Sequence, residues 1–488
     1  MASAPHDDEA MTTYSMHVSA KYLELTKKKL ELTRLPRELE LPDEKRWEQG
    51  TPKSVLEPLL DFWLDGYDWR ASEARFNATL PQYRTTITTR SSTPTQSLRI
   101  HLVHKRSKHT NAIPMLLCHT WPSSFIEVQR VIDALTDPQS VAGYASGEQQ
   151  AFHVVAPSIP GFGFSDASTC HDFGLNGTAE VFDALMVRLG YGRYVAHGTG
   201  WGFGICRVLA LQYPQHCIAV HTANPAFNEP TYNRGPIHYL KYSVAKLTQA
   251  KTPWLSFGYV PSEVQTPDTS KDTAAKTKMY GGEALGPTLP RLYSLRPQTL
   301  AFSLCDSPVG LLAALLDVIH TRNVPPRPLS QRSRSPFLSP VELGMQDEQE
   351  DGDDEIPVGS RAINSHNGDG RCYMWSPTEV LNFTMLQWLP GPEAALRWLR
   401  RAHMDTASPS YQRYTSVPLG ISTFLAPNSS TATPLMWGAS SWDISWVKRH
   451  NGRPATLPGF EAPDALVLDL RECFGGMVAR GRIQLAVL

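Results

Sequence analysis

From about residue 96, short apolar runs alternate with amphipathic stretches. "QSLRIHLVHKR" alternates apolar and polar positions as a strand does, and several short continuous apolar runs are typical of buried parallel strands: "AIPMLLCH", "AFHVVAPSIPGFGFS", "RYVAHG" and "CIAVHTANP". Between them lie stretches with helical spacing: "SSFIEVQRVIDALTD", "TAEVFDALMVRLGY" and "WGFGICRVLALQYP". Strands that alternate with helices predict an α/β protein with a parallel sheet.

The rest of the chain divides by the same patterning. Residues 1–95 indicate short helices and turns, and the aromatic spacing around Trp63 and Tyr67 predicts that this segment packs on another domain. Residues 230–415 are mostly helical, except that 323–371 lose all periodicity and predict a disordered surface insertion. Residues 416–488 contain a strand, "SVPLGISTF", and a closing helix, "DALVLDLRECF".

Composition narrows the functional classes. The 488 residues suffice for two or three domains, or for one domain with large insertions, and 41% hydrophobic residues with a net charge of −1 are typical of a globular protein. Such a balance gives no reason to expect nucleic acid or an anionic membrane as partner. The seven cysteines lack metal-ligand spacing, and neither a signal peptide nor an apolar run of roughly 18 residues is visible. We therefore expect a cytoplasmic protein without metal, cofactor or membrane span.

The stretch "HGTGWG" has the spacing of a catalytic turn. A strand, "RYVAHG", runs into a helix, with small residues, Gly198 and Gly202, on either side of Gly200. In the nucleophile elbow of α/β-hydrolases the central residue is strained, with φ above zero, and the helix packs closely on the strand, so the flanks must be small. The sequence therefore predicts an elbow whose central residue has no reactive side chain.

The chain resembles the epoxide hydrolase family of microsomal and fungal type, which has an N-terminal meander domain. The resemblance covers nearly the whole chain and is carried by the segments "HVSAKYLELTKKKLELTRLPRE", "CHTWPSSFIEVQRVIDALTDP" (similar to the family's HGWPGS segment), "VVAPSIPGFGFS", "RPQTLAFSLCDSPVGLLA" and "PLGISTF". It implies an α/β-hydrolase fold with a helical cap over a buried pocket. The domains would be a meander over 1–95, the core over 96–229 and 416–488, and the cap with return helices over 230–415.

The family's catalytic residues do not carry over. Its aspartate nucleophile falls on Gly200, its orienting acid on or near Pro427, and its histidine base on Arg453. By a looser alignment the two cap tyrosines fall on Leu289 and Leu399. The resemblance therefore implies the scaffold without its covalent hydrolytic chemistry, because glycine has no nucleophile and arginine is no base at neutral pH.

Other residues could replace this chemistry. The backbone N–H groups of Trp121 and Trp201 could polarise a carbonyl or an alkoxide. Arg453 could bind an oxyanion or reach solvent, and His197 could be an acid or base or a hydrogen-bonded structural residue. We predict that these four residues carry whatever catalysis there is.

Two alternatives concern the pocket floor and a substitute triad. His119, Thr199, Gly200, Leu289 and Leu399 are predicted to contact substrate, although His119 also fits a structural role. Thr199, His450 and Asp443 form a conceivable replacement set.

Three functional hypotheses follow. The first is a repurposed enzyme that promotes cyclisation, isomerisation or a pericyclic step on a mostly apolar small molecule, which suits natural-product pathways, where fungal-type relatives are often placed. The second is epoxide opening with a rearranged site, and the third is a non-catalytic binding protein. The oligomeric state stays open, with a homodimer as one alternative.

Overall fold

The structure is a computed structural model, and it describes most of the chain. Leu289, a predicted substrate contact, and Pro427, where the orienting acid of the resemblance falls, lie outside the described residues, as does the predicted insertion after Asn323. The described residues are 10–42, 45–89, 95–139, 150–233, 235–264, 296–323, 373–425 and 433–485.

One mixed sheet organises the part of the chain that the structure describes. Its strands lie in the order β1-β2-β3-β5-β4-β6-β7-β8-β9, with antiparallel pairing from β1 to β5 and parallel pairing from β5 to β9. The predicted α/β-hydrolase fold is confirmed, whereas the sheet that was predicted to be parallel is parallel only from β5 to β9. The strands are β1 (Thr12–Thr13), β2 (Gln82–Thr88), β3 (Ser97–Lys105), β4 (Ile113–Cys118), β5 (Phe152–Pro157), β6 (Tyr194–Gly198), β7 (Cys217–Ala223), β8 (Thr415–Leu425) and β9 (Trp442–Asn451).

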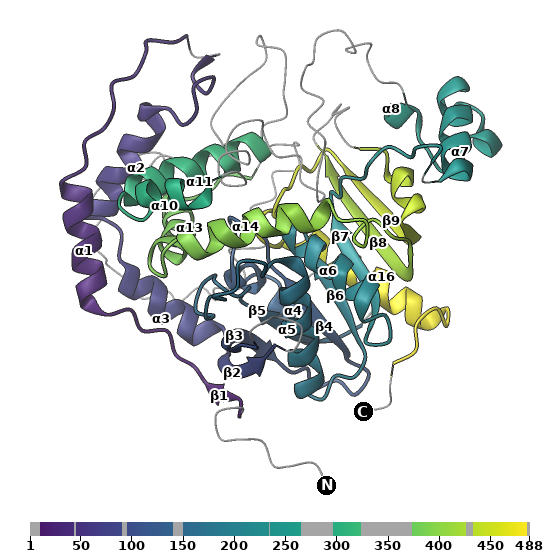
Figure 1. Cartoon of the computed structure of the whole chain (residues 1–488), viewed down its shortest axis with the longest axis horizontal. Helices are drawn as coiled ribbons and strands as arrows, with labels where there is room; N and C mark the ends of the chain where they lie inside the picture. The colour runs from purple at the N-terminus through teal and green to yellow at the C-terminus, as the bar shows by residue number, and fades with distance from the viewer. Residues whose placement is uncertain are drawn as a thin grey trace.

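Helices cover both faces of this sheet (Figure 1). Up to β7 they are α1 (Ala20–Glu31), α2 (Lys53–Asp65), α3 (Trp69–Thr79), the 3₁₀ helix η3 (Phe125–Val128), α4 (Ile132–Thr136), α5 (Leu175–Arg188) and α6 (Gly200–Gln212). Between β7 and β8 come α7 (Pro236–Leu247), η4 (Pro253–Leu255), α8 (Pro261–Val264), α10 (Pro297–Leu304), α11 (Pro308–Asn323), α13 (Pro377–Trp388) and α14 (Glu393–Thr406). The chain continues through η6 (Leu435–Ser440), α15 (Pro458–Glu461) and α16 (Pro463–Ala479).

The alternating strand pattern separates two hydrophobic clusters, one on each face. Within β6, Val195 belongs to the cluster that includes Phe474 of α16, whereas Ala196 belongs to the cluster that includes Leu209 of α6. Side chains two residues apart on a strand share a face, so His197 lies on the α16 face with Val195. This assignment decides which groups His197 can contact.

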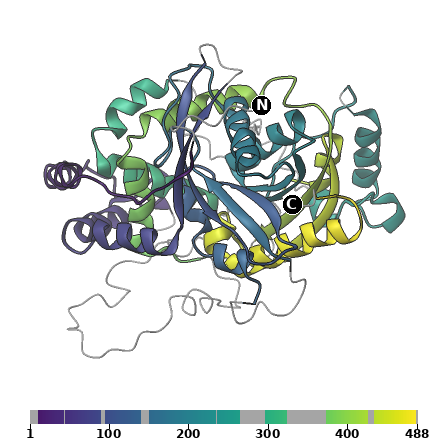
Figure 2. The same ribbon diagram turned by 90° about the horizontal axis from the view of Figure 1, so that it is seen from below.

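The N-terminal helices pack on the helices that follow β7, as the aromatic pattern predicted. Trp63 and Trp69 are buried in the same cluster as Trp375. The Tyr67 hydroxyl donates to Asn382 Oδ1 at 2.8 Å, and Trp388 Nε1 donates to Thr26 Oγ1 at 2.8 Å. Figure 2 shows this N-terminal segment, in purple, and α7, in teal, on opposite sides of the sheet.

One local sequence begins a helix as its pattern indicates, and another does not form the helix that was predicted for it. The "SPTEV" segment begins α13 with a capping box, in which Glu379 N–H donates to Ser376 Oγ at 3.3 Å and Ser376 N–H donates to Glu379 Oε2 at 3.0 Å. The stretch "SSFIEVQRVIDALTD", predicted as one helix, instead forms η3 and the short α4. All four residues of η3 are buried, so the amphipathic exposure that a continuous helix needs is missing there.

The described helices were compared with the length and hydropathy that a membrane-spanning helix needs. No single helix among them is both long and apolar enough to cross a bilayer. Part of α11, Pro308–His320, passes the length and hydropathy test together with α10, but the pair is bent by 118°.

At the turn from β6 to α6, the first residues of the helix pack very closely on the sheet. A Cβ atom on Gly198 would lie 2.5 Å from the carbonyl carbon of Gly202, and one on Gly202 would lie 2.1 Å from the carbonyl oxygen of Cys118. Real Cβ atoms do not approach backbone this closely. Glycine at both positions therefore sets the distance between α6, β6 and β4.

We expect Gly202→Ala to destabilise the protein, because the added methyl group would push α6 away from the Cys118 carbonyl. Overpacking of this kind costs about 1–3 kcal/mol of unfolding free energy. Gly192→Ala is the matched control, since a Cβ atom there meets nothing within 4 Å, and its effect should stay within about 0.5 kcal/mol. Urea denaturation measures both, and equal stabilities for the two variants would contradict the packing argument.

Candidate active site

The loops that follow the parallel strands meet at one edge of the sheet. Cys118 at the end of β4 pairs with Gly198 at the end of β6, so the loop that begins with His119 lies beside the one that carries Gly200. The loop with Arg453 follows β9 on the same side of the sheet, because β4 and β6 to β9 run parallel. Ligands of open α/β sheets bind at this carboxyl edge.

Gly200 occupies the centre of a tight turn. Its φ of +49° lies in the left-handed region, which glycine adopts without steric cost. Gly200 is partly exposed, whereas its neighbours Thr199 and Trp201 are buried. The predicted elbow geometry is present, and its central residue reaches the surface of the site without a side chain.

The backbone N–H of Trp201, one of the two predicted oxyanion donors, already has a partner. It donates to the Thr120 hydroxyl at 3.0 Å, and that hydroxyl in turn donates to the Trp121 carbonyl over a longer distance of 3.4 Å. Thr120 stands where the HGWPGS segment of the resemblance has glycine. A substrate oxygen would therefore meet a threonine hydroxyl where a bare N–H was predicted.

His119 is buried between backbone groups. Its Nε2 accepts the N–H of Ile159 at 3.0 Å, and its Nδ1 lies 3.3 Å from the Thr120 carbonyl, to which it donates. Burial lowers the pKa of His119 to about 4, so the ring is neutral at pH 7. Both ring nitrogens are used to fix the loop that carries Thr120, which favours a structural role.

His197 belongs to a buried hydrogen-bonded chain that crosses three strands. Its Nδ1 lies 3.0 Å from Nδ1 of His221 on β7, and His221 Nε2 lies 3.0 Å from the Ser422 hydroxyl on β8. Ser422 donates to Asp469 Oδ2 on α16 at 2.6 Å, and His450 Nε2 lies 2.7 Å from the same oxygen. The chain lies on the face of the sheet that α16 covers.

The carboxylate of Asp469, at the end of this series of hydrogen bonds, fixes which group donates and which accepts in each of them. Burial by itself raises the pKa of Asp469, but hydrogen bonds from His450 and Ser422 hold it below its ordinary value, so the group is ionised and accepts. Ser422 donates its only proton to Asp469, and His221 Nε2 must therefore donate to Ser422.

The same logic extends to His197. Burial lowers the pKa of His221 to about 4 and that of His197 well below its ordinary value, so both rings are neutral. Neutral His221 accepts at Nδ1, which requires His197 to carry its proton on Nδ1. These hydrogen bonds therefore hold His197 in one tautomer on the α16 face, and this favours a structural role for His197.

The conceivable replacement set of Thr199, His450 and Asp443 is not assembled. The carboxylate partner of His450 is Asp469, and Asp443, at the opposite end of β9, pairs with Arg482. The Thr199 hydroxyl is buried without a hydrogen-bond partner among the described groups. A histidine–carboxylate pair exists near the site, but with a different acid.

Arg453 is anchored at the start of the last helix. Its guanidinium forms an ion pair with Asp464 in the first turn of α16, and the side chain is about a third exposed. The residue before it, Gly452, has φ of +83°, which lets the chain leave β9 sharply. An anion that binds Arg453 has to share the guanidinium with Asp464.

Comparisons with known proteins agree with this geometry. Residues 11–128 match the family model described as epoxide hydrolase N terminus, and residues 113–253 match that of the alpha/beta hydrolase fold. The protein named "Putative epoxide hydrolase" from Stigmatella aurantiaca is 29% identical over 477 residues, which cover 96% of this chain and 86% of that protein. Epoxide hydrolase 1 of Sus scrofa is 27% identical over 65% of this chain and 64% of its own length. The chain is therefore similar to epoxide hydrolases over nearly its whole length, and it has the α/β-hydrolase fold.

Solved structures support the fold assignment. The epoxide hydrolase of Aspergillus niger superposes with a TM-score of 0.64 at 22% identity, covering 97% of both chains. The juvenile hormone epoxide hydrolase of Bombyx mori superposes with a TM-score of 0.63 at 19% identity, covering 97% of this chain and 95% of that one. At these identities the likeness shows the shared epoxide hydrolase fold.

Within this α/β-hydrolase scaffold, α14 packs over the elbow through aromatic side chains. The Trp398 ring lies 6.2 Å from the Trp201 ring and 5.5 Å from the Phe162 ring, and its Nε1 donates to Thr178 Oγ1 at 2.9 Å. Leu399 is fully buried in the same cluster. Its predicted contact with substrate stays a prediction.

The structure adds residues that the sequence reasoning missed. Thr120 had a signal, because it interrupts the HGWPGS pattern of the family. His221, Ser422 and Asp469 had none, since they are far apart in the sequence and are brought together only by strand register and by the packing of α16.

We expect Thr120→Val to destabilise the protein, because it removes the acceptor of the buried Trp201 N–H. An unsatisfied buried donor costs about 1–3 kcal/mol. Thr120→Ser retains the hydroxyl and serves as the control. Urea denaturation measures the stabilities, and amide hydrogen exchange at Trp201 should accelerate only in the valine variant; unchanged exchange there would show that Thr120 does not hold this N–H.

The buried histidines also predict how stability depends on pH. Burial lowers the pKa of His101 to about 3 and those of His104, His119 and His221 to about 4. An unfolded histidine has a pKa near 6.5, so below that pH the unfolded chain binds more protons and the free energy of unfolding falls until about pH 4. The loss at pH 5 is on the order of 1–2 kcal/mol per histidine.

Urea denaturation at pH 7.5 and pH 5.0 tests this dependence. His119→Gln should reduce the difference between the two pH values, whereas His17→Gln, at an exposed position, should leave it unchanged. Stability that is constant or rises on acidification would contradict the prediction.

Proposed function

We propose that this chain is an enzyme that uses the epoxide hydrolase scaffold without an enzyme-bound ester. It promotes a non-hydrolytic cyclisation, isomerisation or pericyclic step on a small, mostly apolar molecule, and a natural-product intermediate is the substrate class that we favour. The similarity to epoxide hydrolases supports an enzymatic role. The reaction type rests on the site described above.

One observation carries the proposal: the centre of the elbow is Gly200. With φ of +49° and a partly exposed backbone, the turn presents its central residue to the site. A covalent alkyl-enzyme intermediate needs a nucleophilic side chain there, and glycine has none. The Thr199 hydroxyl next to it is buried, and none of the described side chains supplies it with a base.

The remaining groups suit catalysis by orientation and hydrogen bonding. A substrate held in one reactive conformation can gain up to roughly 7–11 kcal/mol from orientation alone. The Thr120 oxygen accepts the Trp201 N–H, and an oxygen on which negative charge develops would draw the Thr120 proton away from its long, 3.4 Å bond to the Trp121 carbonyl. In this proposal Trp121 and Trp201 fix the position of Thr120 instead of binding the oxyanion directly.

A second candidate is opening of an epoxide with a rearranged site, either by water or by a nucleophile within the substrate. The observation that favours it is the His450–Asp469 pair at 2.7 Å, near the carboxyl end of β9. A histidine oriented by a carboxylate is a general base. In ring opening by water or by a substrate hydroxyl, such a base takes the proton of the attacking hydroxyl, and the opened ring oxygen takes a proton from the imidazolium or from water, so no nucleophile is needed at Gly200.

We expect the purified protein to form no diol from styrene oxide or from longer alkyl epoxides above the uncatalysed background. Gly200→Asp alone should not restore diol formation, because the predicted base position is held by Arg453, ion-paired to Asp464. Chromatography of the products measures both. Diol formation that survives repurification of the wild-type protein would refute the first candidate.

Label from heavy-oxygen water separates the remaining possibilities once a substrate is found. Hydrolytic opening places the label in the product, whereas cyclisation, isomerisation and opening by a substrate nucleophile do not. His450→Gln should lower turnover only in the second candidate. A protein that binds the substrate but never accelerates its conversion would support a binding function.

A further inference from the structure

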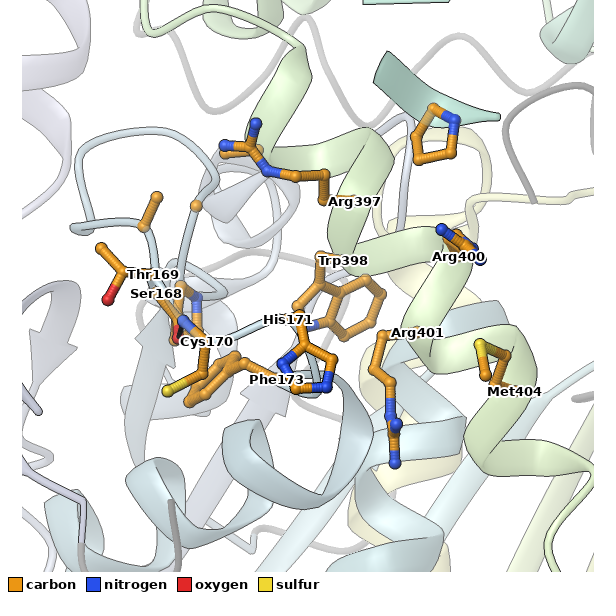
Figure 3. Close-up of a pocket in the computed structure, with 15 residues that line it drawn as sticks. Ser168, Thr169, Cys170, His171, Phe173, Arg397, Trp398, Arg400, Arg401 and Met404 are labelled. Atoms are coloured by element: carbon orange, nitrogen blue, oxygen red, sulfur yellow. Dashed lines mark hydrogen bonds between the residues drawn. The ribbon is translucent and has the colours of Figure 1, made fainter. Parts of the chain in front are cut away.

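A groove outside the elbow lies between α14, the loop over 160–173 and the start of α10. Its volume is about 600 Å³. Figure 3 shows Cys170, His171 and Phe173 of the loop opposite Trp398 of α14. This size falls within the range of cavities that hold small organic ligands.

The groove uses a different face of α14 from the one that turns toward the core. Ala394, Arg397, Arg401 and Met404 line the groove and are spaced three or four residues apart, so they share one side of the helix. Leu399, at about 100° per residue, lies about 160° away from Arg397 and is fully buried. The groove therefore lies on another side of α14 from Leu399, and it shares with the elbow only the Trp398 ring among the described contacts named above.

The polar lining of the groove has one sign of charge. Arg397, Arg400 and Arg401 line it, and Arg296 lines a smaller hollow that continues from it; none of the described lining residues is Asp or Glu. Among the described residues a carboxylate pairs with Arg401 alone of these arginines, with the Arg401 Nε 2.8 Å from Asp405 Oδ1. The side chains of Arg296, Arg397 and Arg400 are exposed and form no ion pair with a described residue.

Nearby carboxylates are already engaged elsewhere. Glu393, one turn before Arg397, accepts the Cys305 thiol at 3.2 Å, and Asp405 also accepts the Leu175 N–H at 2.8 Å. Like charges three to four residues apart on a helix repel each other. A cleft with one sign of charge concentrates counter-ions, so an anion relieves this repulsion.

The other part of the groove is apolar. Phe173 and Trp398 are buried at 6% and 3% exposure, so their edges form a wall, while Met404 is 52% exposed and offers a flexible apolar surface. Pro160 and Pro297 continue this wall. A guanidinium cluster beside an apolar wall suits a ligand with an anionic head and an apolar body, and it suits inorganic anions less well.

We propose that this groove binds an amphipathic organic anion, with a carboxylate or phosphate head on Arg397 and Arg400 and an apolar body against Phe173, Trp398 and Met404. Arginine forms paired hydrogen bonds to both kinds of head group. The proposal concerns a second site and does not depend on the chemistry at Gly200.

Calorimetric titration of the full-length protein at low salt tests the ligand class. Decanoate and decyl phosphate should bind, and comparing them distinguishes the two head groups. Decanol and acetate should bind at least about tenfold more weakly, because each lacks one half of the ligand, and decyltrimethylammonium should not bind. Raising the salt to about 0.15 M should weaken the binding of both anions. Decanol binding as tightly as decanoate would overturn the proposal.

Substitutions test the location. Arg397→Gln with Arg400→Gln should weaken decanoate binding about tenfold, and Met404→Ser about threefold. Arg413→Gln, at an exposed arginine outside the groove lining, is the control for the loss of an arginine charge elsewhere on the surface and should leave binding unchanged.

Stability provides an independent readout. The double variant should unfold at the same urea concentration as the wild type or a higher one, because it removes two like charges that form no ion pair within the described part of the chain. Normal decanoate binding by the double variant, or an equal loss in Arg413→Gln, would show that the anion binds elsewhere.

Discussion

The close approach of α6 to β6 and β4 is the constraint on which the site depends. Gly198 and Gly202 leave no room for a Cβ atom, since the carbonyl of Cys118 and the backbone of the turn fill that space. This contact places the Trp201 N–H within 3.0 Å of Thr120 and brings the two loops together. The chain keeps the turn although Gly200 has no reactive atom, because the turn is also where strand, helix and the neighbouring loop pack.

Desolvation governs the polar groups beneath this edge. His197 and His221 are buried against α16 and stay neutral. The ionised Asp469 therefore sets the direction of the hydrogen bonds that run from it through Ser422 to these two rings. Asp469 in turn lies near solvent-facing cations, with Lys448 Nζ 3.2 Å from its Oδ1. The carboxylate can therefore be ionised inside the fold, whereas the imidazoles farther from the surface cannot be charged.

The sequence predicts the fold better than the site, and the reason is physical. Apolar runs and helical spacing report local burial, which is why β4, β6, α6 and α16 lie where the pattern places them. The elbow could be found because its glycines, Gly198, Gly200 and Gly202, occupy alternate positions within one short stretch of the chain. The chain from His197 to Asp469 could not be found, because residues that are 272 positions apart meet only through strand register and helix packing. Thr120 could have been noticed from its place in "HTWP", but its hydrogen bond to Trp201 forms between two loops that meet only in the folded protein.

The combination of Gly200 and Thr120 at this turn has one physical explanation. A non-glycine residue at φ of +49° costs conformational energy, and Gly200 avoids that cost. Gly200 also brings no carboxylate to the Trp201 N–H, which is one of the backbone donors that the first turn of α6 leaves without an intrahelical partner. The hydroxyl of Thr120, from the adjacent loop, satisfies this donor at 3.0 Å. Gly200 and Thr120 therefore support each other, because Gly200 has no side chain that would compete for the N–H that Thr120 accepts.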